Sequence, residues 1–265
     1  MSAAQIHIAG VHKVFGQGAQ QVVALQGIDL SIAPGQFVCL LGPSGCGKST
    51  LLNAVAGFAP PTSGRISVAG QPVQGAGPDR GMVFQEYALF PWMTVEDNIG
   101  FGLKIRHTPV AERNVTVDRL LQMLGLSEFR LRYPKDLSGG MRQRVAIARI
   151  LALDSPILLM DEPFGALDAL TRRSLQDELL QIQAQWQKTV LFVTHSIDEA
   201  IYLADRVVVL TYRPGTIKLD LPIALPRPRD SSSAGFNELK RELGAVVMQE
   251  QQRHQQAEQR GLAID

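Results

Sequence analysis

The sequence has little cysteine and almost no net charge, and each shortage excludes a class of protein. Two cysteines, Cys39 and Cys46, occur among 265 residues, which is too few for a disulfide framework and favours a reducing compartment. The formal net charge is +1, so no general field attracts nucleic acid or an anionic membrane surface. We therefore expect a cytosolic protein with no nucleic-acid partner.

Long hydrophobic runs are also missing. The two longest, Phe37–Leu41 and residues 200–204, have five residues each, whereas a membrane-spanning helix needs roughly 20. Residues 1–10 carry neither a basic start nor an apolar stretch, so we expect no signal peptide. Any work on a membrane process is therefore expected to be done from outside the bilayer.

Hydrophobic periodicity predicts alternating strands and helices. Ile28, Leu30 and Ile32 alternate with polar residues, as in a half-buried strand, and Phe37–Leu41 is apolar throughout, as in a buried strand of a parallel sheet. Further strands are predicted at residues 65–70, 82–84, 157–160, 190–194 and 207–210, and helices at 49–56, 110–126, 138–153, 170–187 and from 196. This alternation predicts an α/β fold with a parallel sheet and a mostly helical insert at about residues 89–155.

The composition changes beyond Leu225. A Pro-Arg-Pro segment, three serines and a glutamine-rich stretch follow, which favours a linker and a solvated or frayed terminal helix. The alternative is a docking role for the apolar side chains of this helix. They are Phe236, Leu239 and Val246.

A phosphate-binding motif follows the apolar strand. Residues 42–49 match G-x-x-x-x-G-K-[ST] between a predicted strand and a predicted helix. Glycines let backbone N–H groups surround phosphate oxygens, and the helix N-terminus adds a favourable dipole. Lys48 is expected to hold the β- and γ-phosphates and Ser49 to ligate Mg²⁺; a chance glycine-rich turn is the alternative. The expected nucleotide-binding residues here are Gly42, Pro43, Ser44, Gly45, Cys46, Gly47, Lys48, Ser49 and Thr50.

Two acidic residues end a later apolar strand. Asp161 and Glu162 follow residues 157–160, where Asp161 can hold the Mg²⁺ shell, as in the second motif of phosphate-loop NTPases. Glu162 can polarise a water molecule for attack on the γ-phosphate. The alternative is a pair of acidic residues that caps a helix.

A second phosphate-binding helix terminus is predicted at residues 137–144, which read Leu-Ser-Gly-Gly-Met-Arg-Gln-Arg. One chain rarely needs two cradles for a γ-phosphate. If the second serves a nucleotide held by another copy, the protein is a symmetric dimer with composite sites.

Together these motifs resemble the ATP-binding subunits of ABC transporters, over nearly the whole chain up to Leu225. The resemblance also includes Gln85 after the strand at 82–84, a loop that ends at Asp168, and His195 after the strand at 190–194. Met141 departs from the family, which most often has Gln there. The resemblance implies ATP and Mg²⁺ as ligands and hydrolysis of ATP as the activity.

The resemblance also implies residue roles. Phe15 stacks on adenine, although an ordinary core or strand aromatic residue is the alternative. Gln85 contacts Mg²⁺ and the attacking water, and His195 touches the γ-phosphate. The implied catalytic residues are Glu162, His195 and Gln85; the metal ligands are Ser49, Gln85 and Asp161; and the contacts at the dimer interface are Ser138, Gly139, Gly140 and Asp168.

The implied fold is α/β, with a phosphate-loop NTPase core around a parallel sheet, an N-terminal antiparallel β subdomain and a helical signature subdomain. Residues 1–225 are expected to form the ATPase domain, with the helical subdomain at about 89–155, and residues 226–265 a linker and a C-terminal helical tail. The implied partners are a second copy, transmembrane permease subunits and, indirectly, a periplasmic or extracellular solute-binding protein. The chain is then expected at the cytoplasmic face of the membrane.

Residues 90–99 and 163–168 resemble the subgroup that imports nitrate, sulfonate, taurine and bicarbonate. This predicts the ATP-hydrolysing subunit of an importer whose cargo is a small (organic) anion such as nitrate, sulfonate or taurine. An exporter subunit, or a soluble ABC ATPase without a permease, is the alternative. A phosphate-loop kinase is disfavoured because it lacks the 137–144 motif and the equivalent of His195.

Overall fold

The computed structural model describes residues 5–259, apart from the side chains at positions 19 and 258. The chain forms two compact units. Of the described residues, the first unit contains 5–76 and 189–259, and the second contains 77–188. Within residues 5–259, no helix is both long and apolar enough to span a bilayer.

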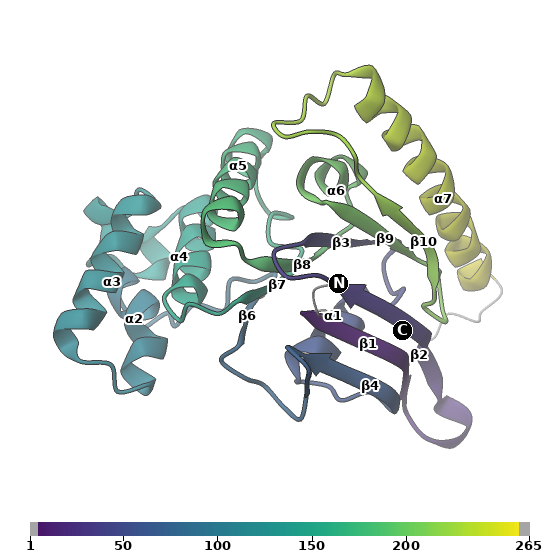
Figure 1. The fold of residues 1–265 in the computed structure, drawn as a ribbon, viewed down its shortest axis with the longest axis horizontal. Coiled ribbons are helices and arrows are strands. Elements are labelled where there is room, and N and C mark those ends of the chain that lie inside the picture. The colour runs from purple at the N-terminus through teal and green to yellow at the C-terminus, as the bar shows by residue number, and fades with distance from the viewer. Residues whose placement is uncertain (1–4, 260–265) are drawn as a thin grey trace. The chain divides into compact units, whose positions relative to one another are not determined.

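The first unit contains an antiparallel sheet with the strand order β2-β1-β4-β5. Its strands are β1 (Ile6–Phe15), β2 (Val22–Ile32), β4 (Ser63–Val68) and β5 (Gln71–Pro72). The alternating residues Ile28, Leu30 and Ile32 are buried, because successive side chains of a strand point to opposite faces. The predicted antiparallel β subdomain is therefore confirmed, and its strands lie side by side in Figure 1.

The first unit also contains three parallel strands. They are β3 (Phe37–Leu41), β8 (Thr189–Thr194) and β9 (Arg206–Leu210), with β3 in the middle and β10 (Ile217–Pro222) antiparallel to β9. Every residue of β3 is buried, as its unbroken apolar pattern predicts. Two helices, α1 (Lys48–Ala56) and α6 (Ile197–Leu203), follow β3 and β8, and a short 3₁₀ turn covers Gly18–Gln20.

The chain beyond the sheet forms α7 (Ala234–Gln259), drawn in yellow in Figure 1. Its Phe236 side chain is only 1% exposed and Leu243 is buried, and the helix packs against α6. The expectation of a solvated or frayed helix is therefore wrong for this face, because apolar burial outweighs the polar, glutamine-rich composition. The alternative, a docking role, is confirmed for Phe236, whereas Leu239 and Val246 are only half-buried.

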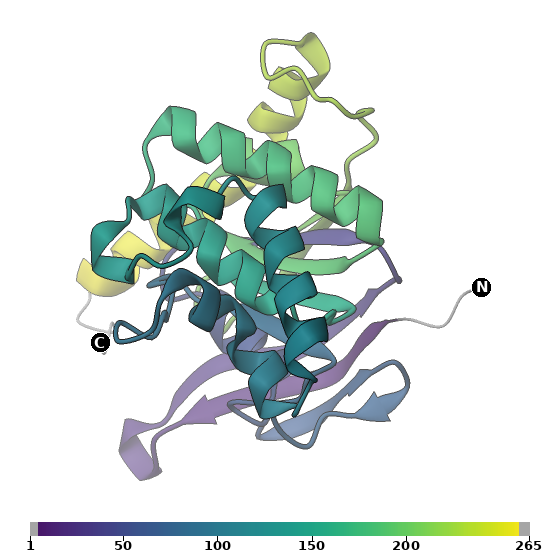
Figure 2. The same ribbon diagram turned by 90° about the vertical axis from the view of Figure 1, so that its left-hand side faces the viewer.

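The second unit consists of four helices around one pair of parallel strands. The strands are β6 (Arg80–Val83) and β7 (Ile157–Asp161), and the helices are α2 (Val95–Ile105), α3 (Val110–Met123), α4 (Gly139–Leu151) and α5 (Ala169–Trp186). Short 3₁₀ turns cover Ser127–Phe129 and Pro134–Asp136. These helices face the viewer in Figure 2, in teal and green. Helix α4 packs on α2, α3 and β6, so it is the central element of this unit.

Gly81 of β6 allows the close approach of strand and helix. A Cβ atom at this position would overlap the Ile150 side chain of α4. Asn98 of α2 is also buried, and its side-chain nitrogen donates to the carbonyl oxygens of Phe90, Met93 and Thr94 at 3.0–3.2 Å. This buried amide therefore holds the segment before α2 in one conformation.

Candidate nucleotide-phosphate site

The phosphate loop (residues 42–49) connects β3 to α1 and depends on glycines in the left-handed region. Gly45 and Gly47 have φ angles of +73° and +98°. A Cβ atom at Gly47 would lie 2.7 Å from the Leu25 side chain and 2.9 Å from the Ala24 carbonyl oxygen. Only glycine fits there without strain, which explains the motif in terms of the surrounding fold.

The Lys48 ammonium group lies inside this loop. Lys48 is 5% exposed, and Nζ donates to the carbonyl oxygens of Gly42 and Pro43, both at 2.9 Å. A buried cation needs such partners because burial otherwise removes its hydration. The loop thus already holds a positive charge at the position where the motif needs one for phosphate.

Cys46 lies beside this lysine and is fully buried. Its Sγ lies 3.8 Å from Lys48 Nζ. Burial raises the pKa of the Cys46 thiol, and the nearby Lys48 charge opposes that rise without cancelling it. The thiol therefore stays protonated and unreactive at neutral pH, and it serves as a small packed side chain within the loop.

His195 leaves the sheet beside the phosphate loop. In the parallel register of β3 and β8, Leu41 pairs with Thr194, so Gly42 and His195 follow neighbouring strand ends. The turn is held by Thr194, whose hydroxyl accepts from Ser196 N at 3.0 Å and donates to Glu199 at 2.5 Å. Ligands of parallel sheets bind at the carboxyl ends of the strands, so both segments are placed for one ligand.

Phe15 ends β1 and pairs with Val22 of β2. Its side chain is 46% exposed, and Lys13 Nζ lies 5.1 Å from the ring centroid. This exposure excludes a core aromatic residue, whereas an ordinary strand aromatic residue stays open as the alternative, because Phe15 ends β1. An exposed ring remains available for stacking on a base.

In the second unit, Gln85 and Asp161 lie near the carboxyl ends of adjacent strands. Val83 pairs with Met160 in the parallel register of β6 and β7; Gln85 lies two residues beyond the end of β6, and Asp161 is the last residue of β7. Glu162 comes next with a φ of +43°, a conformation that side chains with a Cβ atom rarely adopt. Such backbone strain is common where a side chain is held for function.

The segment after Gln85 is fixed by α4. Tyr87 and Ala88 have left-handed φ angles of +62° and +47°, and Arg149 donates to both of their carbonyl oxygens, at 3.1 and 2.6 Å. Burial lowers the pKa of Arg149. Sequence patterns do not predict this role of Arg149, because α4 also carries Arg142 and Arg144 and nothing in the pattern distinguishes the three arginines.

The predicted second cradle forms the start of α4. Ser138 is the N-cap, and its Oγ accepts from Met141 N at 3.3 Å. A Cβ atom at Gly140 would lie 2.5 Å from the Thr171 side chain of α5, so the two helix starts are neighbours. Asp168 caps α5 by accepting from Leu170 N and Thr171 N at 3.1 and 3.0 Å. Chiefly the Thr171 N–H bond lowers the pKa of Asp168.

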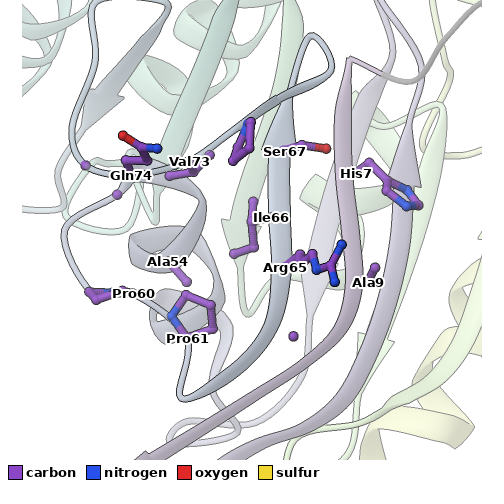
Figure 3. Close-up of a pocket in the computed structure, with 14 residues that line it drawn as sticks. His7, Ala9, Ala54, Pro60, Pro61, Arg65, Ile66, Ser67, Val73 and Gln74 are labelled. Carbon is purple, nitrogen blue, oxygen red and sulfur yellow. The ribbon is translucent and has the colours of Figure 1, made fainter.

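A cavity of about 490 Å³ lies elsewhere in the first unit, beside β4 (Figure 3). Pro60, Pro61 and Val73 form part of its wall, and Arg65 lines it as well. None of its lining residues belongs to the phosphate loop. The cavity is therefore separate from the site described above.

The fold and the loop around Lys48 define a phosphate-loop nucleotide-binding protein. A protein-family model described as ABC transporter matches residues 25–165. The nitrate import ATP-binding protein of Synechocystis sp. is 49% identical over 237 residues, 89% of each chain. The aliphatic sulfonates import ATP-binding protein of Bacillus licheniformis is 46% identical over 231 residues, 87% of this chain and 89% of that one.

A solved structure is also similar to this chain in fold and sequence. It is a dimeric ATP-binding cassette in a post-hydrolysis state bound to ADP and Pi, with a TM-score of 0.74 and 31% identity, covering 83% of this chain and all of that chain. The chain belongs to the ATP-binding family of ABC transporters. It is an ATPase.

Proposed function

We propose that this ATPase drives an importer whose permease is a separate chain. The observation that carries the proposal is the similarity, over 87–89% of this chain, to proteins described as nitrate and aliphatic sulfonate import subunits. A third relative, 49% identical over 228 residues, is described as a bicarbonate transport ATP-binding protein. These cargoes share only small size and negative charge, so we propose a small inorganic or organic anion as the cargo.

ATP binds through the phosphate loop, with Phe15 against the base and Lys48 against the β- and γ-phosphates. Lys48 must exchange its bonds to the Gly42 and Pro43 carbonyls for bonds to phosphate oxygens, which are stronger acceptors because they are charged. His195 contacts the γ-phosphate. Glu162 accepts a proton from the attacking water.

The residues assigned to Mg²⁺ fit this ion chemically. Ser49 offers a hydroxyl, Gln85 an amide oxygen and Asp161 a carboxylate, and Mg²⁺ prefers such oxygen ligands together with substrate phosphates. When bound, Mg²⁺ neutralises charge that develops on the β- and γ-phosphate oxygens. Gln85 also orients the attacking water.

The start of α4 completes the site of a second copy. Ser138, Gly139 and Gly140 offer the N-terminus of a 13-residue helix, and the positive end of the helix dipole suits a phosphate. Asp168 contacts the opposing copy. The solved cassette with the same fold is described as dimeric and bound to ADP and Pi, which supports this arrangement.

We place the protein at the cytoplasmic face of the membrane, with permease subunits as partners and a solute-binding protein linked indirectly. Trp92, in the segment between Gln85 and α2, is 70% exposed; an exposed large aromatic residue favours a protein partner. Residues 1–225 act as the ATPase domain, with the helical subdomain at about 89–155, and residues 226–265 as linker and tail.

Cargo uptake in cells tests the importer proposal. Deleting the gene should abolish uptake of one labelled anion among nitrate, an alkyl sulfonate and bicarbonate. The wild-type gene should restore uptake, and Glu162→Gln should not, although it is expressed equally. Normal uptake of every anion in the deletion strain, together with impaired efflux of another compound, would favour an exporter instead.

A further inference from the structure

The loop between β9 and β10 (residues 211–216, the β9–β10 loop) packs against the phosphate loop. Gly215 N donates to the Ala24 carbonyl, and Gln26 N donates to the Gly215 carbonyl, both at 2.9 Å. A Cβ atom at Gly215 would overlap the carbonyl oxygen of Cys46. The backbone of the β9–β10 loop therefore touches the middle of the phosphate loop.

Arg213 adds a side-chain contact to this packing. Its Nε donates to the Gly45 carbonyl oxygen at 3.1 Å. A planar trans peptide points its C=O and its N–H in opposite directions, so this bond directs the Cys46 N–H away from Arg213. That N–H contacts the Pro43 carbonyl at 3.4 Å, a long and weak bond that a phosphate oxygen can replace.

Helix α7 holds the other side of the β9–β10 loop. Glu250 of α7 is 0% exposed, and one of its oxygens accepts from Tyr212 N at 2.9 Å. The other accepts from Lys218 Nζ at 2.5 Å and from Arg253 at 3.1 Å. The rings of Tyr212 and His254 also stack, with centroids 4.4 Å apart. One buried carboxylate thus ties α7 to the residue beside Arg213.

The charge state of Glu250 supports this connection. Burial raises the pKa of its carboxyl, but the bonds from Lys218 and from the Tyr212 N–H outweigh burial, and the net pKa lies below the ordinary value. Glu250 is therefore ionised at neutral pH and accepts strong, charge-assisted hydrogen bonds.

We propose that α7 sets the affinity of the phosphate loop for ATP: Glu250 fixes Tyr212, and the adjacent Arg213 holds the Gly45 carbonyl outward. Both Glu250 and Arg213 are positioning residues, since neither needs to touch the nucleotide. The inference rests on ATP binding at the phosphate loop. It gives the C-terminal helix a role in the ATPase cycle, because any partner that displaces α7 weakens ATP binding.

The test measures equilibrium binding of a fluorescent ATP analogue to the full chain, with Mg²⁺. Arg213→Gln and Glu250→Gln should each raise the Kd by about fivefold or more, the size of an ordinary coupling between sites. The matched control is Lys240→Ala, which removes the 2.7 Å ion pair between α7 and Asp198 of α6. This control should leave the Kd within about twofold of wild type.

The double variant tests whether Glu250 acts on ATP binding through Arg213 or independently of it. Because Glu250 acts through Arg213, Arg213→Gln with Glu250→Gln should bind ATP no more weakly than Arg213→Gln alone. At saturating ATP, both single variants should keep kcat near wild type while KM rises, whereas a loss of folded protein would lower kcat. If Glu250→Gln fails to fold, Lys218→Met replaces it, and the Kd should again rise.

Unchanged Kd values in folded Arg213 and Glu250 variants would overturn the inference, and so would strictly additive effects. A wild-type chain that binds no ATP would instead overturn the proposed nucleotide site. Failure of this inference can therefore be distinguished from failure of the proposed nucleotide site.

Discussion

Leu41 and Thr194 are directly opposite each other in the parallel pair of β3 and β8. The next residues along the two strands, Gly42 and His195, leave the sheet at the same edge for this reason. Gly42 and His195 are 153 positions apart in the chain, yet both are available to one bound nucleotide, as is usual at the carboxyl ends of parallel strands. The second unit has a similar arrangement, because the Val83–Met160 pair brings Asp161, the last residue of β7, and Gln85, two residues beyond β6, to the same edge of their strand pair.

Glu162→Gln should slow ATP hydrolysis by about 10²–10⁴-fold, or roughly 3–5 kcal/mol of activation free energy, because a general base is lost. Affinity for ATP should persist, and an ATP-bound dimer should accumulate in size-exclusion chromatography. Glu128→Gln, an exposed acidic residue of the same unit, is the control and should hydrolyse normally. Near-normal turnover of Glu162→Gln would remove this residue from the mechanism.

Ser138→Arg should leave ATP binding to one chain largely intact but abolish hydrolysis, since a long cation replaces a small hydroxyl at the proposed dimer contact. The control is Ser138→Ala, which loses the 3.3 Å cap bond to Met141 N without adding bulk. It should lose part of its thermal stability and keep more of its activity. Wild-type hydrolysis by Ser138→Arg would contradict the composite site.

Mixing Ser138→Arg with Lys48→Ala chains tests the dimer more sharply. In a mixed dimer both lesions fall in one composite site, and the other site is wild type in both halves. ATPase activity should reappear on mixing if each site can act alone. One inactive variant is titrated into the other, and the released phosphate measures the recovered ATPase activity. Each variant alone gives the baseline.

Stability should fall at alkaline pH because of the buried thiols. Burial, followed by the Glu199 charge, raises the pKa of Cys39 well above the usual 9.0, and burial raises the pKa of Cys46. Below pH 9 the Cys39 and Cys46 thiols keep their protons in both the folded and the unfolded chain, so their contribution to the free energy of unfolding is fully present. Above that pH only the unfolded state loses its proton, so the free energy of unfolding decreases as pH rises toward the folded pKa.

Urea unfolding at pH 7, 9 and 10 measures this effect. Cys39→Ala should be less stable than wild type at pH 7 but should lose less stability between pH 9 and 10. The same decline in both proteins would assign the effect to other groups. A thiol reagent at pH 8 should also react slowly with the native chain and quickly in urea.

Arg229→Ala should destabilise the fold by about 1–3 kcal/mol, the cost of leaving buried carbonyls without a donor. The buried guanidinium donates to the carbonyl oxygens of Ile201 and Ala204, both at 2.6 Å, at the end of α6. Burial chiefly lowers its pKa, to about 10, which leaves it charged at neutral pH. Arg229→Lys should recover only part of the loss, because one ammonium group cannot reach the same set of acceptors; a melting temperature equal to wild type would contradict this role.

The features that could be predicted from the sequence are those that depend on neighbouring residues in the chain. The apolar run of β3, the alternation in β2 and the glycines around Lys48 depend on burial and backbone geometry within a few residues, so these two strands, the phosphate loop and the start of α1 could be predicted, whereas β1, β10 and α2 were not. The acids at the end of β7 and the serine before α4 were recognisable for the same reason. The residue pattern of each of these segments can be recognised whatever fold surrounds it.

Tertiary structure alone decided which distant residues serve those segments. Arg149 reaches the carbonyls of Tyr87 and Ala88, 62 and 61 positions away, and Arg213 reaches Gly45 across 168 positions. The polar composition of α7 predicted a solvated tail, yet Phe236 and Glu250 are buried. A hydrogen bond or an apolar contact over such separations depends on how strands are ordered and helices are packed. That order follows from the burial of the whole core and not from any short pattern.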